Sequence, residues 1–352
     1  MMRRIGMRRI SMRRIPLRDS TLQGAAMTPP AALARPRSWR VPVLLTGLIV
    51  LALLVPVLTD KQDTLNLLFL ICLYITLGQS WNILAGFAGQ ISLGHAAFFG
   101  IGALVARSLW LNGLFFPVAF LLSGLAAVAF AMLIGVPTFR LRGAYFAIGT
   151  LGIAEVLRIT IGQNMPLIST MAATEIAHYD LRLRYYAALG LALVAIGAAT
   201  LLLRSSWSLG ILALREDEEA AQATGVNVLA HKLLALFISS LFAGLAGGLF
   251  AFQQISYYPS AAFTPQWTFD ALLITFIGGL GTIGGPVLGA IFFILVRQQL
   301  AVTLVEVHQI VFGILFILIV LVFPSGLIGA WHRLRPRALV AALRDRRRPR
   351  PS

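Results

Sequence analysis

Gln90, Ser92 and His95 are the polar side chains of a glycine-rich apolar stretch, residues 86–103. Amide, hydroxyl and imidazole groups in such a stretch either contact a polar solute or hydrogen-bond to a neighbouring helix. A single membrane histidine more often has the second role, so we expect His95 to hydrogen-bond to another helix. A place for these three residues on a solute path is the alternative.

Two carboxylates also fall within long apolar runs. An ionised acid at the centre of a bilayer costs about 2.5–3.5 kcal/mol on insertion scales, so such residues usually pair or line a cavity. Glu155 precedes Arg158 by three positions, which are neighbours on a helix, so we expect this pair to form. A place for Glu155 on a solute path is again the alternative. Asp270 is close to the outer end of its predicted span, where we expect it to be hydrated.

Catalytic and nucleotide-binding motifs are missing from the sequence. There is no Gly-x-x-x-x-Gly-Lys-Ser/Thr phosphate loop, and the two lysines, Lys61 and Lys232, lie far from any such pattern. Neither His-Glu-x-x-His nor Gly-x-Ser-x-Gly occurs. The single cysteine, Cys72, excludes a disulfide framework and a cysteine metal cluster. We therefore expect no enzyme, no metal and no cofactor, and any ATP must be bound by another chain.

The elements that position these residues are predicted to be membrane helices. Of the 352 residues, 58% are apolar and 12% are charged, and the mean hydropathy is +0.85. A span needs ~20 apolar residues, so the sequence predicts an all-α polytopic membrane protein with about ten transmembrane helices. The predicted spans are 41–58, 65–85, 88–106, 114–136, 143–162, 185–203, 232–255, 268–283, 285–304 and 308–329.

The net charge of +16 comes from the two ends of the chain. Residues 1–42 hold ten arginines and one acid, and residues 330–352 hold eight arginines and one acid, while basic and acidic residues balance between them. The charge therefore does not indicate a nucleic-acid-binding surface. Cytoplasmic segments beside a membrane carry an excess of Lys and Arg. We expect both termini in the cytoplasm, which requires an even number of spans.

The longest predicted cytoplasmic loop, residues 204–231, contains four consecutive acids at 216–219. Residues 211–224 are predicted to form one short amphipathic helix, with Ile211, Leu214, Ala220 and Ala221 on one side. Gly225 is placed to end it, because glycine commonly terminates helices in the left-handed conformation. A solvated helix face is the simplest interpretation of the acids.

The spacing Glu219-Ala220-Ala221, three residues, then Gly225 resembles the EAA loop of ABC-importer permeases. Segments 86–103, 141–158 and 277–289, and the ending Val-Phe-Pro-Ser-Gly-Leu-Ile-Gly at 322–329, resemble the branched-chain amino acid (LivH/LivM) family of these permeases. The likeness covers about residues 65–330, and the LivM type is the nearer match.

Charge and composition predict three parts, which are a basic disordered tail over 1–40, a transmembrane permease domain over 41–329 and a basic tail over 330–352. The resemblance implies a paralogous permease subunit, two cytosolic ATP-binding subunits and an extracytoplasmic solute-binding protein, in a bacterial inner membrane. Coupling to the ATPase would fall to Glu218, Glu219, Ala220, Ala221 and Gly225. The solute path is assigned, more weakly, to four polar residues, Gln90, Ser92, His95 and Glu155.

One segment departs from the family pattern. Between the fifth and sixth spans, where a Thr-Gly-Gly type segment is expected, the chain reads Gly-Gln-Asn-Met-Pro-Leu-Ile-Ser-Thr-Met-Ala-Ala-Thr-Glu over 162–175. A permease for urea or short amides therefore stays as one alternative. An ion-gradient-driven secondary transporter is the alternative from another class, and it would work without a partner ATPase.

Overall fold

The computed structural model describes residues 50–303 except 60, 166–168, 172–175 and 177–178, together with 311, 313–314, 317, 321 and 326–329. The predicted tails and most of the spans 41–58 and 308–329 lie outside the described residues. The chain divides into two compact units after Leu54. Residues 50–58 are helical, and every element named below belongs to the second unit.

Helices dominate the second unit, because apolar segments in lipid must satisfy their backbone hydrogen bonds internally. The helices are α2 (Gln62–Trp81), η1 (Asn82–Phe87), α3 (His95–Leu111), α4 (Phe116–Thr138), α5 (Ala144–Asn164), α7 (Leu181–Arg204), α8 (Trp207–Glu216), α9 (Glu218–Ala223), α10 (Val228–Gln253), α11 (Pro259–Ala262), α12 (Gln266–Gly278) and α13 (Gly285–Thr303). Two short strands, β1 (Ser169–Thr170) and β2 (Ser256–Tyr257), form an antiparallel pair with Ser169 opposite Tyr257.

Within the described part of the chain, six of the ten predicted spans are helices long and apolar enough to cross a membrane. They are Gln62–Phe87, Phe116–Thr138, Ala144–Asn164, Leu181–Arg204, Val228–Gln253 and Gly285–Thr303. Two further predicted spans are shorter helices than expected. The span predicted at 88–106 is α3, which begins only at His95, and the span predicted at 268–283 is α12, which ends at Gly278.

The late start of α3 has a structural cause. Residues 88–94 form a non-helical segment, and side chains of other helices satisfy some of its backbone groups. The indole Nε1 of Trp81 donates to the Ser92 carbonyl at 2.8 Å, and the Leu93 amide donates to Thr150 Oγ1 at 3.1 Å. The Ala96 amide, in the first turn of α3, donates to Thr268 Oγ1 at 2.8 Å. Non-helical backbone at membrane depth is tolerated where protein satisfies it in this way.

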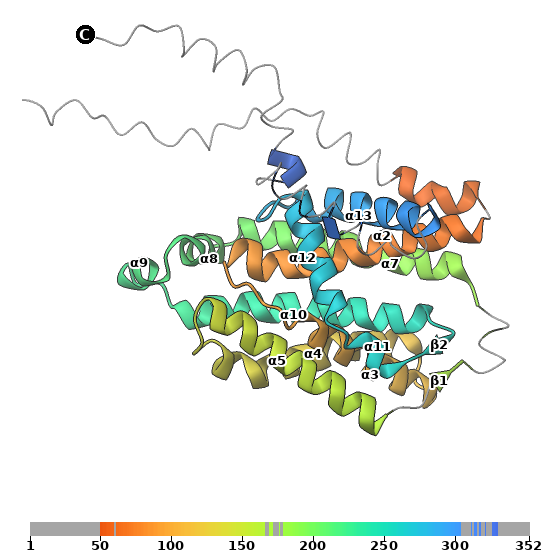
Figure 1. The fold of residues 1–352 in the computed structure, drawn as a ribbon, viewed down its shortest axis with the longest axis horizontal. Helices are drawn as coiled ribbons and strands as arrows, with labels where there is room; N and C mark the ends of the chain where they lie inside the picture. The colour runs from red at the N-terminus through yellow and green to blue at the C-terminus, as the bar shows by residue number, and fades with distance from the viewer. Residues whose placement is uncertain are drawn as a thin grey trace, which may run out of the picture. The chain divides into compact units, whose positions relative to one another are not determined.

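Helix α10 packs against α3 and α4 in one group of helices and against α2 in the other, which also contains α7, α12 and α13 (Figure 1). Small residues make the α3–α10 contact close. A Cβ atom at Gly102 would overlap with the backbone of Gly244, and one at Gly247 would overlap with the Phe99 carbonyl oxygen. Such small-residue seams replace the hydrophobic driving force that is missing between helices in lipid.

Segments predicted to share one membrane side meet at one end of this unit. Helix η1, helix α8 and the α12–α13 loop come together there. Gly281 N donates to Asn82 Oδ1 at 2.9 Å, Asn82 Nδ2 donates to the Thr282 carbonyl at 3.0 Å, and Arg215 Nη1 of α8 donates to the Gly86 carbonyl at 3.0 Å. The segments predicted on the opposite side meet around β1 and β2.

Candidate functional site

The acidic loop folds into two short helices, α8 and α9, instead of the single helix predicted over 211–224. Asp217 lies between them with extended backbone (φ −158°), and its Oδ1 accepts from the amides of Glu219 at 2.9 Å and Ala220 at 3.0 Å. An aspartate in this position is a preferred N-cap, because it satisfies amides that have no partner inside the helix. Asp217 thus starts a new helix where continuation was expected.

One side of α8 and α9 packs on the bundle. Ile211, Leu214 and Ala221 are buried, as predicted. Ala220 was placed with them and is exposed, which corrects that part of the prediction. Helical spacing explains this: at about 100° per residue, Ala220 lies on the side of a helix opposite Ile211, whereas Leu214 and Ala221 lie near it. The exposed surface of α9 therefore includes Ala220 as well as Glu219 and Gln222.

Two acids of the 216–219 run pair with basic side chains from other segments of the chain. Glu218 Oε2 accepts from Lys232 Nζ of α10 at 2.6 Å, with side-chain exposures of 28% and 2%. Glu219 Oε1 accepts from Arg142 Nη1 in the α4–α5 loop at 3.2 Å, and both side chains are largely exposed. The Lys232 ammonium also lies 5.7 Å from the ring centre of Phe139. The buried pair attaches α9 to the membrane bundle.

Gly225 ends α9 as predicted, with φ +90°. The Val226 amide donates to the Ala221 carbonyl at 3.1 Å, and the Gly225 amide donates to the Gln222 carbonyl at 3.0 Å. These two bonds form the Schellman motif, in which glycine takes the left-handed position. A Cβ at Gly225 would meet nothing within 4 Å, so backbone conformation and not space favours glycine there.

Helix α8 connects this surface to the centre of the bundle. Arg215 Nη1 donates to the Gly86 carbonyl of η1 at 3.0 Å. Gly89 has φ +70° and lies against the Arg215 backbone, where a Cβ would be only 3.0 Å from the Arg215 Cα. Helix α8 therefore contacts both η1 and the start of the segment that carries Gln90, Ser92 and His95.

The residues placed on the solute path are partly brought together. His95 is fully buried, and its Nε2 lies 2.7 Å from Ser239 Oγ of α10, which confirms the predicted bond to a neighbouring helix. Ser92 is buried three residues before it, and Gln90 is half-buried nearer the α8 end of the segment. The carboxamide of Gln79 is also buried, and within the described part of the chain neither of its polar atoms has a hydrogen-bond partner.

Glu155 lies apart from that group, on α5. Arg158 Nε donates to Glu155 Oε2 at 2.9 Å, and a second bond joins Nη2 to Oε1, so the predicted pair is confirmed. Both side chains are more than one-third exposed. Among the described residues, no hydrogen bond or ion pair joins Glu155 to Gln90, Ser92 or His95.

Asp270 is buried, with 1% exposure, and the expectation that it is hydrated was wrong. Three donors explain its burial. Tyr74 Oη donates to Oδ2 at 2.9 Å, Arg297 Nη1 donates to Oδ2 at 3.0 Å, and Gln266 Nε2 donates to Oδ1 at 2.7 Å. Arg297 Nη1 also donates to Tyr74 Oη at 3.1 Å. The sequence analysis missed this cluster, although a lone arginine in a predicted span is a signal for one.

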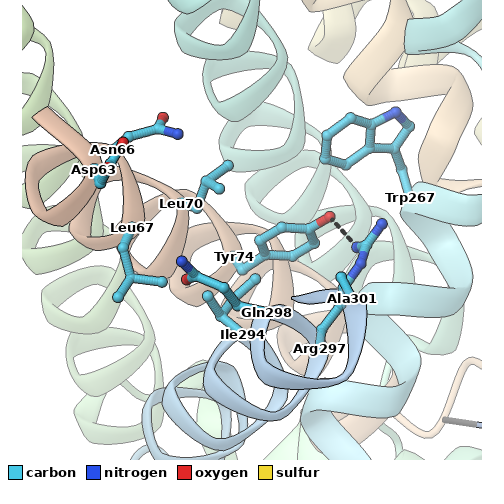
Figure 2. Close-up of a pocket in the computed structure, with 10 residues that line it drawn as sticks. All are labelled: Asp63, Asn66, Leu67, Leu70, Tyr74, Trp267, Ile294, Arg297, Gln298 and Ala301. Carbon is cyan, nitrogen blue, oxygen red and sulfur yellow. Dashed lines mark hydrogen bonds between the residues drawn. The ribbon is translucent and has the colours of Figure 1, made fainter. Parts of the chain in front are cut away.

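The Tyr74 and Arg297 side chains face a cavity of about 510 Å³ between α2, α12 and α13 (Figure 2). Its wall combines apolar and polar side chains. The lining residues are Asp63, Asn66, Leu67, Leu70, Tyr74, Trp267, Ile294, Arg297, Gln298 and Ala301. This combination is typical of small-molecule sites.

Arg107 was also missed by the sequence analysis. It is 2% exposed and donates to four backbone carbonyls, Ala251, Gln254, Ile255 and Ser169, and to Ser169 Oγ, at 2.8–3.3 Å. It therefore fixes the β1–β2 pair to the end of α10. Burial raises the pKa of Tyr257 in β2, although nearby Arg107 opposes the change, so its hydroxyl stays neutral.

The chain is similar to transport proteins. A family model described as "Branched-chain amino acid transport system / permease component" matches residues 64–320. The high-affinity branched-chain amino acid transport system permease protein LivM of Escherichia coli K12 is 31% identical over 317 residues, which cover 81% of this chain and 74% of that protein. The LivM protein of Salmonella typhimurium is 30% identical with the same coverage. The probable LivM protein of Methanocaldococcus jannaschii is 26% identical over 36% of this chain and 41% of its own. No solved structure matches.

Proposed function

Because the chain belongs to the family of branched-chain amino acid transport permeases, we propose that it is the membrane-spanning subunit of an ATP-driven importer for branched-chain or other hydrophobic amino acids. It is a multi-pass membrane transport protein and not an enzyme. In this proposal, separate ATPase subunits supply the energy and act on the chain through α8, α9 and Gly225.

The observation that carries the coupling proposal is the attachment of α9. Its outer surface, with Glu219, Ala220 and Gln222, is exposed, while the buried Glu218–Lys232 pair holds it to α10. Small exposed residues allow a partner to approach closely, and the anchored side transmits a displacement to the bundle. Through Arg215 the same displacement reaches Gly86 and the segment that follows it.

The proposed assembly follows from the family. It contains a paralogous permease subunit, two cytosolic ATP-binding subunits and an extracytoplasmic solute-binding protein, in the lipid bilayer of a bacterial inner membrane. The chain has ten spans with both termini in the cytoplasm, which places α8 and α9 on the ATPase side. The contact of Arg215 in α8 with Gly86, and those of Asn82 with Gly281 and Thr282, support the location of α8, η1 and the α12–α13 loop at one end of the bundle.

A substitution at Gly225 tests the coupling. We expect Gly225→Trp to lower amino acid uptake about tenfold or more and to uncouple ATP hydrolysis, while membrane insertion is unchanged. The indole would project from the exposed end of α9, where the partner must seat, and the left-handed backbone would be strained.

Gly113 offers a matched control. It has φ +86°, and a Cβ there also meets nothing within 4 Å, but it lies in the α3–α4 loop, on the opposite side of the proposed topology. Gly113→Trp introduces the same strain and bulk and should leave uptake close to wild type. Normal uptake by Gly225→Trp, or equal loss in both variants, would refute the coupling role.

A further inference from the structure

We infer that the cavity between α2, α12 and α13 is a binding site for the transported amino acid within this chain, with Arg297 as the residue that binds its carboxylate. This inference rests on the proposed function and adds a substrate site to it.

The Arg297 guanidinium has one side occupied and one side available. Nη1 donates to Tyr74 Oη and to Asp270 Oδ2. Within the described part of the chain, Nε and Nη2 have no hydrogen-bond partner, and the side chain is 43% exposed. Two parallel N–H donors of this kind match the two oxygens of a carboxylate. The buried Asp270 holds the guanidinium in place from behind, so its orientation is set before a ligand arrives.

The rest of the wall fits a branched aliphatic amino acid. Leu67 and Leu70 of α2 and Ile294 of α13 provide apolar surface in the cavity that Arg297 lines (Figure 2). Asp63 contributes a negative charge to the same cavity. A cavity of about 510 Å³ is in the range of small-molecule sites. Arg297 provides the cationic group for the carboxylate and the apolar side chains suit an aliphatic side chain, whereas Asp63 lies about three helical turns before Tyr74 on α2, at the other end of the cavity (Figure 2).

The position of Arg297 argues for a path rather than for a lipid-facing surface. It is the thirteenth residue of α13, a helix long and apolar enough to span a membrane. Ionisable groups within spans usually face the bundle interior or a water-filled cavity, because contact with lipid is costly. An open cavity that exposes nearly half of this side chain therefore opens toward a polar passage.

Filling the cavity provides the test. Ala301 lines it, whereas the next residue, Val302, is 73% exposed and does not. In proteoliposomes with the complete importer, we expect Ala301→Trp to lower leucine uptake about tenfold or more, with ATP hydrolysis stimulated by the binding protein within about twofold of wild type. Val302→Trp should change neither. Unchanged ATP hydrolysis shows that the variant is folded and assembled.

A second variant tests the arginine itself. Arg297→Lys keeps a positive charge beside Asp270 but loses the paired donors, so we expect uptake to fall about tenfold with assembly retained. In saturation-transfer NMR on the importer without its binding protein, isovalerate, which keeps the carboxylate, should bind, and isoamylamine, which lacks it, should not. Wild-type uptake by Ala301→Trp, or equal binding of both probes, would overturn the site. A wild-type importer that transports no leucine would overturn the proposed function and the site with it.

Discussion

Removing the carboxylate of Glu218 should release α9 from the bundle. Lys232 has 2% side-chain exposure and its Nζ lies 2.6 Å from Glu218 Oε2. Breaking a fully buried ion pair costs about 3–5 kcal/mol, because a buried charge is left without a partner. Glu218 is 28% exposed, so water reaches its side of the pair and we reduce the cost to about 2–3 kcal/mol. Glu218→Ala should therefore raise the population of the open form of α9 about 30- to 150-fold.

The assay is hydrogen–deuterium exchange of the backbone amides of α9 in the purified protein. Exchange through local opening reports the free energy of that opening directly. Lys232→Met removes the buried charge and leaves the partly exposed carboxylate of Glu218, so the free energy of opening should fall by less, about 1 kcal/mol. The double variant should exchange more slowly than Glu218→Ala, because no charge is then left buried, and the cycle should yield a coupling energy of about 2 kcal/mol.

Two results would refute this reasoning. Wild-type exchange in Glu218→Ala would show that the ion pair does not hold α9. Effects that simply add in the double variant would show that Lys232 and Glu218 act through packing and not through their charges.

Two further predictions concern the close contact between α3 and α10 and the β1–β2 pair. Gly247→Ala should destabilise the protein by about 2–3 kcal/mol in thermal unfolding, since the added methyl group meets the Phe99 carbonyl. Gly190→Ala, whose methyl group meets nothing within 4 Å, should leave stability equal or raise it by up to about 1 kcal/mol. Equal stability changes in the two variants would contradict the close packing of α3 and α10. Arg107→Lys should cost about 2–3 kcal/mol, because three donors replace five hydrogen bonds, and faster hydrogen exchange in β1 and β2 should reveal it. Unchanged exchange there would show that Arg107 does not hold the ribbon.

Local chemistry was predictable from the sequence where both partners are near in the chain. Glu155 and Arg158 are three residues apart on one helix, and their pair is present. Gly225 ends its helix because the left-handed conformation is a local preference. The break at Asp217 also had a local signal, since an aspartate before two glutamates is a common start of a helix. The prediction of one helix over 211–224 did not take that signal into account.

Contacts between distant segments were not predictable in the same way. Asp270 is buried because Tyr74 and Arg297, which are 196 and 27 residues away, converge on it. Nothing in the residues around Asp270 indicates that convergence, so proximity to the end of a span suggested hydration instead. The start of α3 at His95 similarly depends on Thr150 and Thr268 from other helices. Hydropathy identifies apolar segments, and it does not show where such a segment is not helical.

The function proposed for this permease is ATP-driven import of a branched-chain amino acid. Its most direct test is uptake of radiolabelled leucine into proteoliposomes that contain this chain, its paralogous permease subunit, the two ATPases and the binding protein. We expect uptake that requires ATP hydrolysis and continues when ionophores collapse the proton and sodium gradients. Uptake without the ATPase subunits that stops when a gradient collapses would contradict it.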